Sequence, residues 1–393
     1  MSTVHHVSGN QLMLLENGME FFPQLRTFID AARHSIYLET YIFEADKTGR
    51  MIAEALQRAV ARGVVVRMTL DGFGSAELPQ QFVDGLLAAG IEVQWFRRKI
   101  SPLTLRRSRL RRLHRKLAVM DGEIAFVGGI NIVDDIPVGG DHTAPRLDYA
   151  VRIQGDVAGE IHVAMRHLWS MMSRVNLHRR IKMMRQQLGD KGWHENGKGD
   201  KNIALLLRDN LRHRHDIERA YLQAIAEAQS EVIIACAYFL PGHEFRHALL
   251  QAAQRGVRVV LLLQGKVEYR LQHYATHALY EQWLAANIEI HEYQASYLHA
   301  KVAVVDGQWA TVGSSNIDPF SLLLAREANL VVRDAAFAGT LRASLMAAIS
   351  NDATRIGEDY GSARNFLNRL ISRLSYSLVR LLVGMLASRR HGL

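Results

Sequence analysis

The sequence predicts an α/β protein of two similar lobes, each with a mixed, mostly parallel sheet flanked by helices. Short apolar strand patterns alternate with helical patterns, an order typical of a sheet that is covered by helices on both faces. This order of elements occurs twice along the 393 residues. A short phrase that begins with His-x-Lys and ends with Asp-Gly also occurs twice, as His114–Gly122 and His299–Gly307.

In the first half, apolar runs between turn residues predict strands, and apolar residues at helical spacing predict helices. The strands are expected at 12–15, 35–43, 64–70 and 91–96, and the helices at 21–32, 49–62 and 78–89. Gly63 follows the second helix, where glycine is a common C-terminal cap. The first His-x-Lys phrase then forms a strand, which Asp121-Gly122 turns back as a hairpin.

The second half repeats these elements in the same order. Helices are expected at 220–229, 245–255 and 271–286, strands at 232–239, 257–264 and 288–293, and then the second hairpin. Because the order of helices and strands is the same in both halves, the sequence indicates an internal duplication. We predict an N-terminal lobe at 1–180, a linker at 181–202, a C-terminal lobe at 203–350 and a tail at 351–393.

Composition limits the class of protein. The formal net charge of +9 and the sequence pI near 9.7 favour a polyanionic partner, such as nucleic acid, an anionic membrane or a phosphorylated substrate. The single cysteine, Cys236, excludes a disulfide within the chain and a cysteine-based zinc site. We expect no signal peptide, because Met1–Asn10 lacks an apolar stretch preceded by a basic residue, and no transmembrane helix.

The repeated phrase contains residues suited to phosphate chemistry. On a strand, residues two apart point the same way, so His114 and Lys116 share a face, as do His299 and Lys301. A lysine holds phosphate oxygens by charge, while an imidazole attacks phosphorus or donates a proton. Two such pairs supply a nucleophile and an acid on opposite sides of one phosphorus, as in-line displacement requires. We therefore expect the active site at the interface between the lobes.

Polar residues near each phrase are candidates for supporting roles. Asn131 and Asn316 follow the return strands and are expected to donate hydrogen bonds to phosphate oxygens. Asp148 and Glu327 follow the hairpins at matching places, and we expect them to orient the histidines and stabilise the imidazolium.

Asp121 and Asp306, the acids within the phrases, are also candidate catalytic residues. The alternative is a purely structural role, because aspartate before glycine is favoured in hairpin turns for backbone reasons alone. The sequence leaves these two roles about equally supported.

The two phrases resemble the paired HKD motifs of the phospholipase D superfamily, and the likeness covers roughly residues 10–350. The finer sequence is similar to the short bacterial cardiolipin synthases of that superfamily. The segments that carry this similarity are Leu15–Gly18, Glu39–Phe43, Leu70–Ser75, Val127–Ile132 and Thr311–Pro319. One departure is Ala325, where the family commonly has asparagine two residues before the glutamate.

The resemblance implies that one histidine forms a covalent phosphatidyl-histidine while the other protonates the leaving alcohol and then deprotonates the incoming one. We assign His114 as the nucleophile and His299 as the acid, with the reverse as the alternative. It implies no metal and no other cofactor. The implied reaction moves a phosphatidyl group from phosphatidylglycerol or phosphatidylethanolamine to a hydroxyl of another phosphatidylglycerol, with glycerol as a further candidate substrate. Alternatives are a phospholipase D hydrolase, another phosphatidyltransferase and, less favoured, a nuclease of the same superfamily.

Two basic segments favour a lipid partner. Arg97–Lys116 carries leucines between many arginines and leads into the first histidine, which suits anionic headgroups. Nucleic acid is the alternative for this loop, but base-stacking aromatics are not interleaved with its arginines. No nucleic-acid partner is therefore expected.

The tail has apolar residues at helical spacing between arginines, which favours a helix that lies on an anionic membrane over one that packs on the core. The apolar positions are Phe366, Leu367, Leu370, Ile371, Leu374, Leu378, Leu381, Leu382 and Met385; the arginines are Arg364, Arg369, Arg373, Arg380, Arg389 and Arg390. We expect a peripheral protein at the bacterial cell membrane, on its cytoplasmic side.

Overall fold

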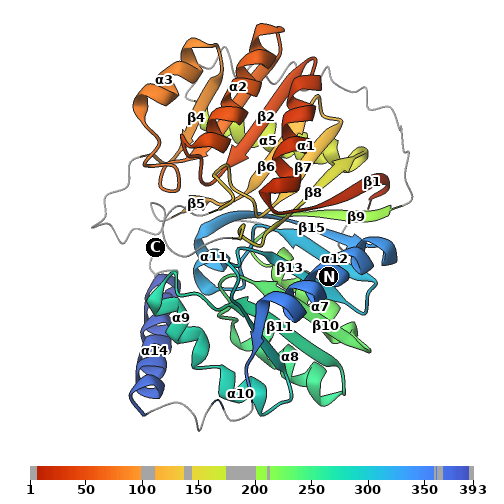
Figure 1. The fold of residues 1–393 in the computed structure, drawn as a ribbon, viewed down its shortest axis with the longest axis vertical. Helices are drawn as coiled ribbons and strands as arrows, with labels where there is room; N and C mark the ends of the chain where they lie inside the picture. Colours follow the sequence, from red (N-terminus) through yellow and green to blue (C-terminus); the bar gives the residue numbers. More distant parts are fainter. Residues whose placement is uncertain are drawn as a thin grey trace.

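The computed structural model describes residues 7–98, 111–136, 144–173, 201–209, 213–357, 360 and 366–388. It contains two α/β lobes, which lie one above the other in Figure 1. Most of the expected linker, residues 99–110 of the basic loop, and Arg364, Arg389 and Arg390 of the tail lie outside the described residues.

The N-terminal lobe contains the expected strands and helices, with shifted ends. Its elements are β1 (Val7–Glu16), α1 (Asn17–Ala31), β2 (Ser35–Thr40), α2 (Lys47–Ala61), β3 (Val65–Asp71), α3 (Gln80–Ala88), β4 (Glu92–Phe96), β5 (Arg112–Leu113), β6 (Lys116–Met120), β7 (Ile124–Gly128), β8 (Tyr149–Gln154) and α5 (Asp156–Met172). Helix α2 begins after Asp46, whose side chain accepts from the Gly49 N–H at 2.7 Å. It ends before Gly63, whose φ of 89° suits glycine.

The C-terminal lobe repeats the pattern. Its elements are β9 (Lys201–Arg208), α7 (Asp216–Glu227), β10 (Glu231–Cys236), α8 (His243–Gln254), β11 (Arg258–Gln264), α9 (Arg270–His277), α10 (Tyr280–Leu284), β12 (Glu289–Tyr293), β13 (Lys301–Val305), β14 (Trp309–Gly313), α11 (Pro319–Leu324), β15 (Ala325–Arg333), α12 (Ala335–Asp352), β16 (Ala353–Arg355) and α14 (Phe366–Ser388). The helix expected at 271–286 is divided into α9 and α10, and Tyr280 and Trp283 of α10 are buried.

The strands form one sixteen-stranded sheet in the order β16-β12-β11-β10-β13-β14-β15-β9-β1-β8-β7-β6-β2-β3-β4, with β5 paired to β15 beside this path. The sheet is mixed, as expected, but the expected parallel majority is corrected. Among the strands of the described residues, parallel pairing joins β2–β3–β4, β10–β11–β12 and β5–β15, and the other strand pairs are antiparallel. The lobes are joined by antiparallel strands, because β1 pairs with β9 and β9 pairs with β15.

Alternate residues of each strand face opposite sides of the sheet and so enter different cores. Leu117 and Val119 of β6 face a core that extends across both lobes under α5 and α12. Ala118 and Met120 face a second core under α1, α2 and α3. The corresponding face of the C-terminal lobe is covered by α7, α8, α9 and α10, with α14 packed on the outside of α9 (Figure 1). The shared core fixes the two lobes relative to each other.

Two further expectations concern single features of the chain. Cys236 on β10 is buried, and burial raises the pKa of its thiol to about 12, which fits a small core residue. Among the helices within the described ranges, none has the length and apolar character needed to cross a membrane.

Candidate active site

Both His-x-Lys phrases lie where chain from one lobe pairs with chain from the other. Strand β5, just before His114, pairs with the start of β15, and the His114 N–H donates to the Arg326 carbonyl at 3.0 Å. At the matching place, Leu298 forms a bridge with Leu147, and the His299 N–H donates to the Leu147 carbonyl at 2.9 Å. The backbone of each histidine is therefore held by the opposite lobe.

The two expected acids contact the histidines, and each acid contacts the histidine of the other lobe. His114 Nδ1 lies 3.1 Å from Glu327 Oε2, and His299 Nδ1 lies 2.6 Å from Asp148 Oδ2. Both carboxylates are buried, and the Ser314 hydroxyl donates to Glu327 Oε2 at 2.6 Å. Burial raises the pKa of Asp148. Because Nδ1 is occupied in both rings, Nε2 is the nitrogen left for a substrate.

Lys116 and Lys301 are the first residues of β6 and β13 and are 5% and 1% exposed. The Lys116 ammonium donates to the His114 carbonyl at 2.8 Å, and the Lys301 ammonium donates to the His299 carbonyl. Burial, followed by repulsion from Lys301, lowers the pKa of Lys116 to about 7. Burial also lowers the pKa of Lys301. An anion that binds both ammonium groups would relieve this repulsion.

The histidines are largely buried, with 15% of the His114 side chain and 20% of the His299 side chain exposed. Burial lowers the pKa of both imidazoles, and Lys301 and Lys116 lower that of His299 further. Before substrate binds, neutral rings are therefore favoured. A neutral ring that donates from Nδ1 to a carboxylate carries a lone pair on Nε2, as a nucleophile needs.

The two candidate asparagines lie beside the phrases and are buried. Asn131 Oδ1 accepts from the Ile42 N–H at 3.1 Å. Asn316 Oδ1 is buried without a hydrogen-bond partner among the described residues. Their roles toward phosphate remain a prediction.

Asp121 and Asp306 lie at the turns of their hairpins, where their contacts favour the structural alternative, and a catalytic role for them stays a prediction. Each is at the far end of its hairpin strand, with φ of 55° and 52°. The Asp121 carboxylate accepts 2.8 Å bonds from the backbone N–H groups of residues 33, 34 and 35. The Asp306 carboxylate accepts likewise from residues 229, 230 and 231. These acids join each hairpin turn to the start of the neighbouring strand, β2 or β10.

Three residues near the histidines were not identified from the sequence. The Tyr41 ring lies 4.7 Å from the His114 ring, and Lys116 Nζ lies 5.2 Å from the Tyr41 centroid. Asp71 accepts from the Leu113 N–H at 2.7 Å, and Gln264 accepts from the Leu298 N–H at 2.8 Å, so each supports the residue before a histidine. Alignment of the two halves would have placed Asp71 and Gln264 at equivalent strand ends.

This fold and site define a two-lobed protein of the phospholipase D-like class, in which paired histidines and lysines face one site across a lobe interface.

Comparisons with known proteins support the same class. The family model described as "Cardiolipin synthase, PLD-like domain" matches residues 25–135 and 221–348. Cardiolipin synthase B of Escherichia coli (strain K12) is 37% identical over 382 residues, which cover 95% of this chain and 88% of that protein. Cardiolipin synthase of Geobacillus kaustophilus is 30% identical over 326 residues, covering 83% of this chain and 63% of that protein.

Solved structures show the same fold at low sequence identity. The phosphatidylserine synthase of Haemophilus influenzae superposes with a TM-score of 0.68 at 13% identity, covering 98% of this chain and 96% of that one. The polyphosphate kinase of Porphyromonas gingivalis superposes with a TM-score of 0.55 at 14% identity, covering 95% and 53%. The chain belongs to the cardiolipin synthase family of phospholipase D-like proteins.

Proposed function

We propose that the protein is a phosphatidyltransferase that synthesises cardiolipin. It moves a phosphatidyl group from phosphatidylglycerol or phosphatidylethanolamine to a hydroxyl of a second phosphatidylglycerol, through a phosphatidyl-histidine. The observation that carries this proposal is the reciprocal arrangement in which each lobe's histidine is held by the other lobe's acid. This arrangement supports one site with two imidazoles of different roles, and the family supplies the lipid substrates.

The first step makes the covalent intermediate. The lone pair of His114 Nε2 attacks phosphorus, the bond from phosphorus to the headgroup oxygen breaks, and that oxygen takes a proton from His299 Nε2. The phosphodiester anion bound by Lys116 and Lys301 offsets the repulsion that lowers the pKa of His299, so substrate binding favours the protonated ring. Asp148 stabilises the resulting imidazolium.

The second step reverses the proton transfer. The acceptor hydroxyl gives its proton to His299 Nε2 and its oxygen attacks phosphorus. The phosphorus–nitrogen bond breaks, and His114 Nε2 recovers its lone pair. Glu327 holds the His114 ring through both steps. Asn131 and Asn316 are proposed to donate amide N–H groups to the phosphate oxygens.

We propose that α14 attaches the protein to an anionic membrane surface, as a peripheral protein on the cytoplasmic side. One face of α14, with Ser372 and Val379, is buried against the lobe. The opposite face exposes an apolar row: Phe366, Leu367, Leu370, Leu374, Leu378, Leu381 and Met385. Exposed Arg373 and Arg380 lie among them. An apolar row with basic neighbours suits the headgroup region of anionic lipid.

The experiment is incubation of purified protein with vesicles of acyl-labelled phosphatidylglycerol, followed by separation of the lipids. Labelled cardiolipin is expected, and its loss is expected in His114→Ala and in His299→Ala. Phosphatidic acid alone would indicate a hydrolase and overturn synthesis. Absence of any lipid product, together with cleavage of plasmid DNA in a parallel reaction, would indicate a nuclease.

Metal dependence is tested in the same assay. We expect cardiolipin formation to persist after treatment with EDTA and dialysis. Activity that is lost after chelation and restored by added zinc would contradict a mechanism that uses only protein side chains.

A further inference from the structure

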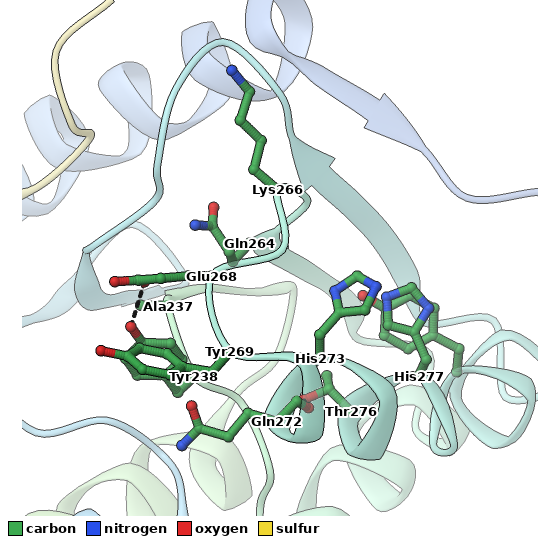
Figure 2. Close-up of a pocket in the computed structure, with 11 residues that line it drawn as sticks. Ala237, Tyr238, Gln264, Lys266, Glu268, Tyr269, Gln272, His273, Thr276 and His277 are labelled. Carbon is green, nitrogen blue, oxygen red and sulfur yellow. Dashed lines mark hydrogen bonds between the residues drawn. The ribbon is translucent and has the colours of Figure 1, made fainter. Parts of the chain in front are cut away.

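A pocket opens in the C-terminal lobe (Figure 2). It lies between the ends of β10 and β11 and the start of α9, and its lining includes Ala237, Tyr238, Gln264 and Glu268. Two hydrogen bonds, one to a side chain and one between backbone groups, connect this lining to the residues that flank His299. Gln264 Oε1 accepts from Leu298, the residue before His299, at 2.8 Å. The Ala237 N–H donates to Ala300, the residue after His299, at 3.0 Å.

In the N-terminal lobe, a loop packs closely at the equivalent place. There the loop after β3 folds onto Tyr41, and the Ser75 hydroxyl donates to the Tyr41 carbonyl at 2.9 Å. A Cβ on Gly74 would lie 2.3 Å from the same carbonyl, so that loop fits only because it has no side chain at this position. In the C-terminal lobe, the loop after β11 has Val267 at this place, with 49% of it exposed. The C-terminal lobe therefore has a pocket beside the backbone that flanks His299, where the N-terminal lobe has a loop packed on Tyr41.

The lining of this pocket suits a neutral molecule with several hydroxyl groups. Gln264 Nε2 is buried and has no hydrogen-bond partner within the described ranges. Tyr238 donates its hydroxyl to the Glu268 carboxylate, which keeps acceptor capacity for further donors. Figure 2 shows both groups on the same side of the pocket as Gln264. A hydroxyl both donates and accepts, so a polyol satisfies the amide and the carboxylate together. The lining holds one carboxylate, Glu268, and one ammonium group, Lys266, so a neutral guest matches its balanced charge.

We propose that this pocket binds the hydroxyl-bearing glycerol headgroup, both as it leaves the donor lipid and as it enters on the acceptor lipid. The proposal rests on the proposed function and adds the alcohol subsite. In-line displacement puts the nucleophile on one side of phosphorus and the alcohol on the other. Because the pocket lining is bonded to the residues on both sides of His299, we assign His299 as the acid and base for the alcohol oxygen and His114 as the nucleophile.

Two variants test the pocket without removing a histidine or a lysine. Gln264→Glu keeps an oxygen that accepts from the Leu298 N–H, as Asp71 does for Leu113, but it loses the buried amide donor. Glu268→Gln keeps the shape of the side chain and removes the charge. Val267→Ala, in the same loop but outside the pocket lining, is the matched control.

The assay supplies acyl-labelled phosphatidylglycerol and measures the ratio of cardiolipin to phosphatidic acid. It also measures the concentration of radiolabelled glycerol that half-saturates its exchange into phosphatidylglycerol. Loss of one or two hydrogen bonds predicts a change of about tenfold in both quantities for the two pocket variants. Val267→Ala is expected to match the unmodified protein. Unchanged values in both pocket variants would overturn the alcohol subsite while leaving synthesis intact.

A binding measurement separates the pocket from catalysis. In saturation-transfer NMR with glycerol, the unmodified protein is expected to give a signal that weakens in both pocket variants. A protein that makes no lipid product but still shows this pattern would refute the synthase and keep the pocket. Cardiolipin synthesis without any glycerol signal would refute the pocket alone.

Discussion

His299 of the C-terminal lobe is held by Asp148 of the N-terminal lobe, with 2.6 Å between Nδ1 and Oδ2. The converse contact joins His114 to Glu327 at 3.1 Å. Neither lobe thus contains a complete imidazole–carboxylate pair of its own. The two duplicated halves form one active site because strands β1, β9 and β15 join them into a single sheet.

Removal of either acid should therefore affect the histidine of the opposite lobe. For Asp148→Asn and Glu327→Gln we expect kcat to fall about 10²- to 10⁴-fold, because the imidazole loses its orienting partner and the charge that stabilises its protonated form. The measurement is initial rate of phosphatidylglycerol consumption at saturating lipid, with Tm recorded for each variant.

Glu123→Gln, an exposed acid in the turn of the first hairpin, is the matched control. It should leave kcat unchanged. Full activity in Asp148→Asn at an unchanged Tm would show that the cross-lobe contact has no catalytic role.

The buried lysines predict a fall in kcat/KM at alkaline pH. Lys116 must be charged to hold phosphate, and its pKa in the free protein is about 7. As pH rises through this value, Lys116 loses its proton and donor affinity falls. The pH profile of kcat/KM measures this step. Lys116→Arg retains its charge at higher pH, so its remaining activity should show a flatter alkaline limb; an unchanged limb would assign the titration to another group.

The lowered pKa of Lys116 also affects the free energy of unfolding. In the unfolded chain, Lys116 stays protonated up to the ordinary pKa of a lysine side chain. In the folded protein it releases its proton near pH 7. Between these values the unfolded state binds more protons, so this group makes the free energy of unfolding rise with pH. Inorganic phosphate should raise Tm most below pH 7, where the Lys116 ammonium is charged, and progressively less above it. A phosphate effect that is independent of pH would contradict this account.

The sequence predicted the duplicated lobes because strand and helix periodicity and the two phrases are local signals. It also predicted Asp148 and Glu327 as histidine partners, since they lie at matching places after the hairpins. It did not predict which acid contacts which histidine, because that depends on how β5 and β15 pair across the lobes. The pocket at Gln264 was missed for a related reason, since it depends on where the loop after β11 lies relative to Tyr238 and α9 and not on a sequence motif.

Asp121 and Asp306 are expected to act on stability rather than on chemistry. Asp306→Ala removes three acceptor contacts to backbone N–H groups, and after allowance for solvent screening we expect a loss of about 1–2 kcal/mol in the free energy of unfolding. Urea denaturation measures the loss, while kcat per folded molecule should stay unchanged.

The pH dependence distinguishes this role from catalysis. Backbone hydrogen bonds depress the pKa of Asp306 below its ordinary value. Its contribution is therefore present above the unfolded pKa and lost as pH falls through the lower, folded pKa. The stability difference between Asp306→Ala and the unmodified protein should vanish in acid. A large fall in kcat at full folding would restore Asp306 to the catalytic set.

The exposed apolar row of α14 is predicted to bind the membrane surface. Leu374→Glu with Leu381→Glu places two charges on the exposed face and leaves buried Val379 in place, so the fold should be retained. Burial of a leucine in an apolar phase contributes about 1.5–3 kcal/mol, so the double variant should bind vesicles of phosphatidylglycerol at least about tenfold more weakly in sedimentation assays. Val163→Glu, at an exposed apolar residue of α5, is the control and should bind normally. Normal sedimentation of the double variant would refute α14 as the attachment surface, whereas equal loss in the control would indicate a general charge effect.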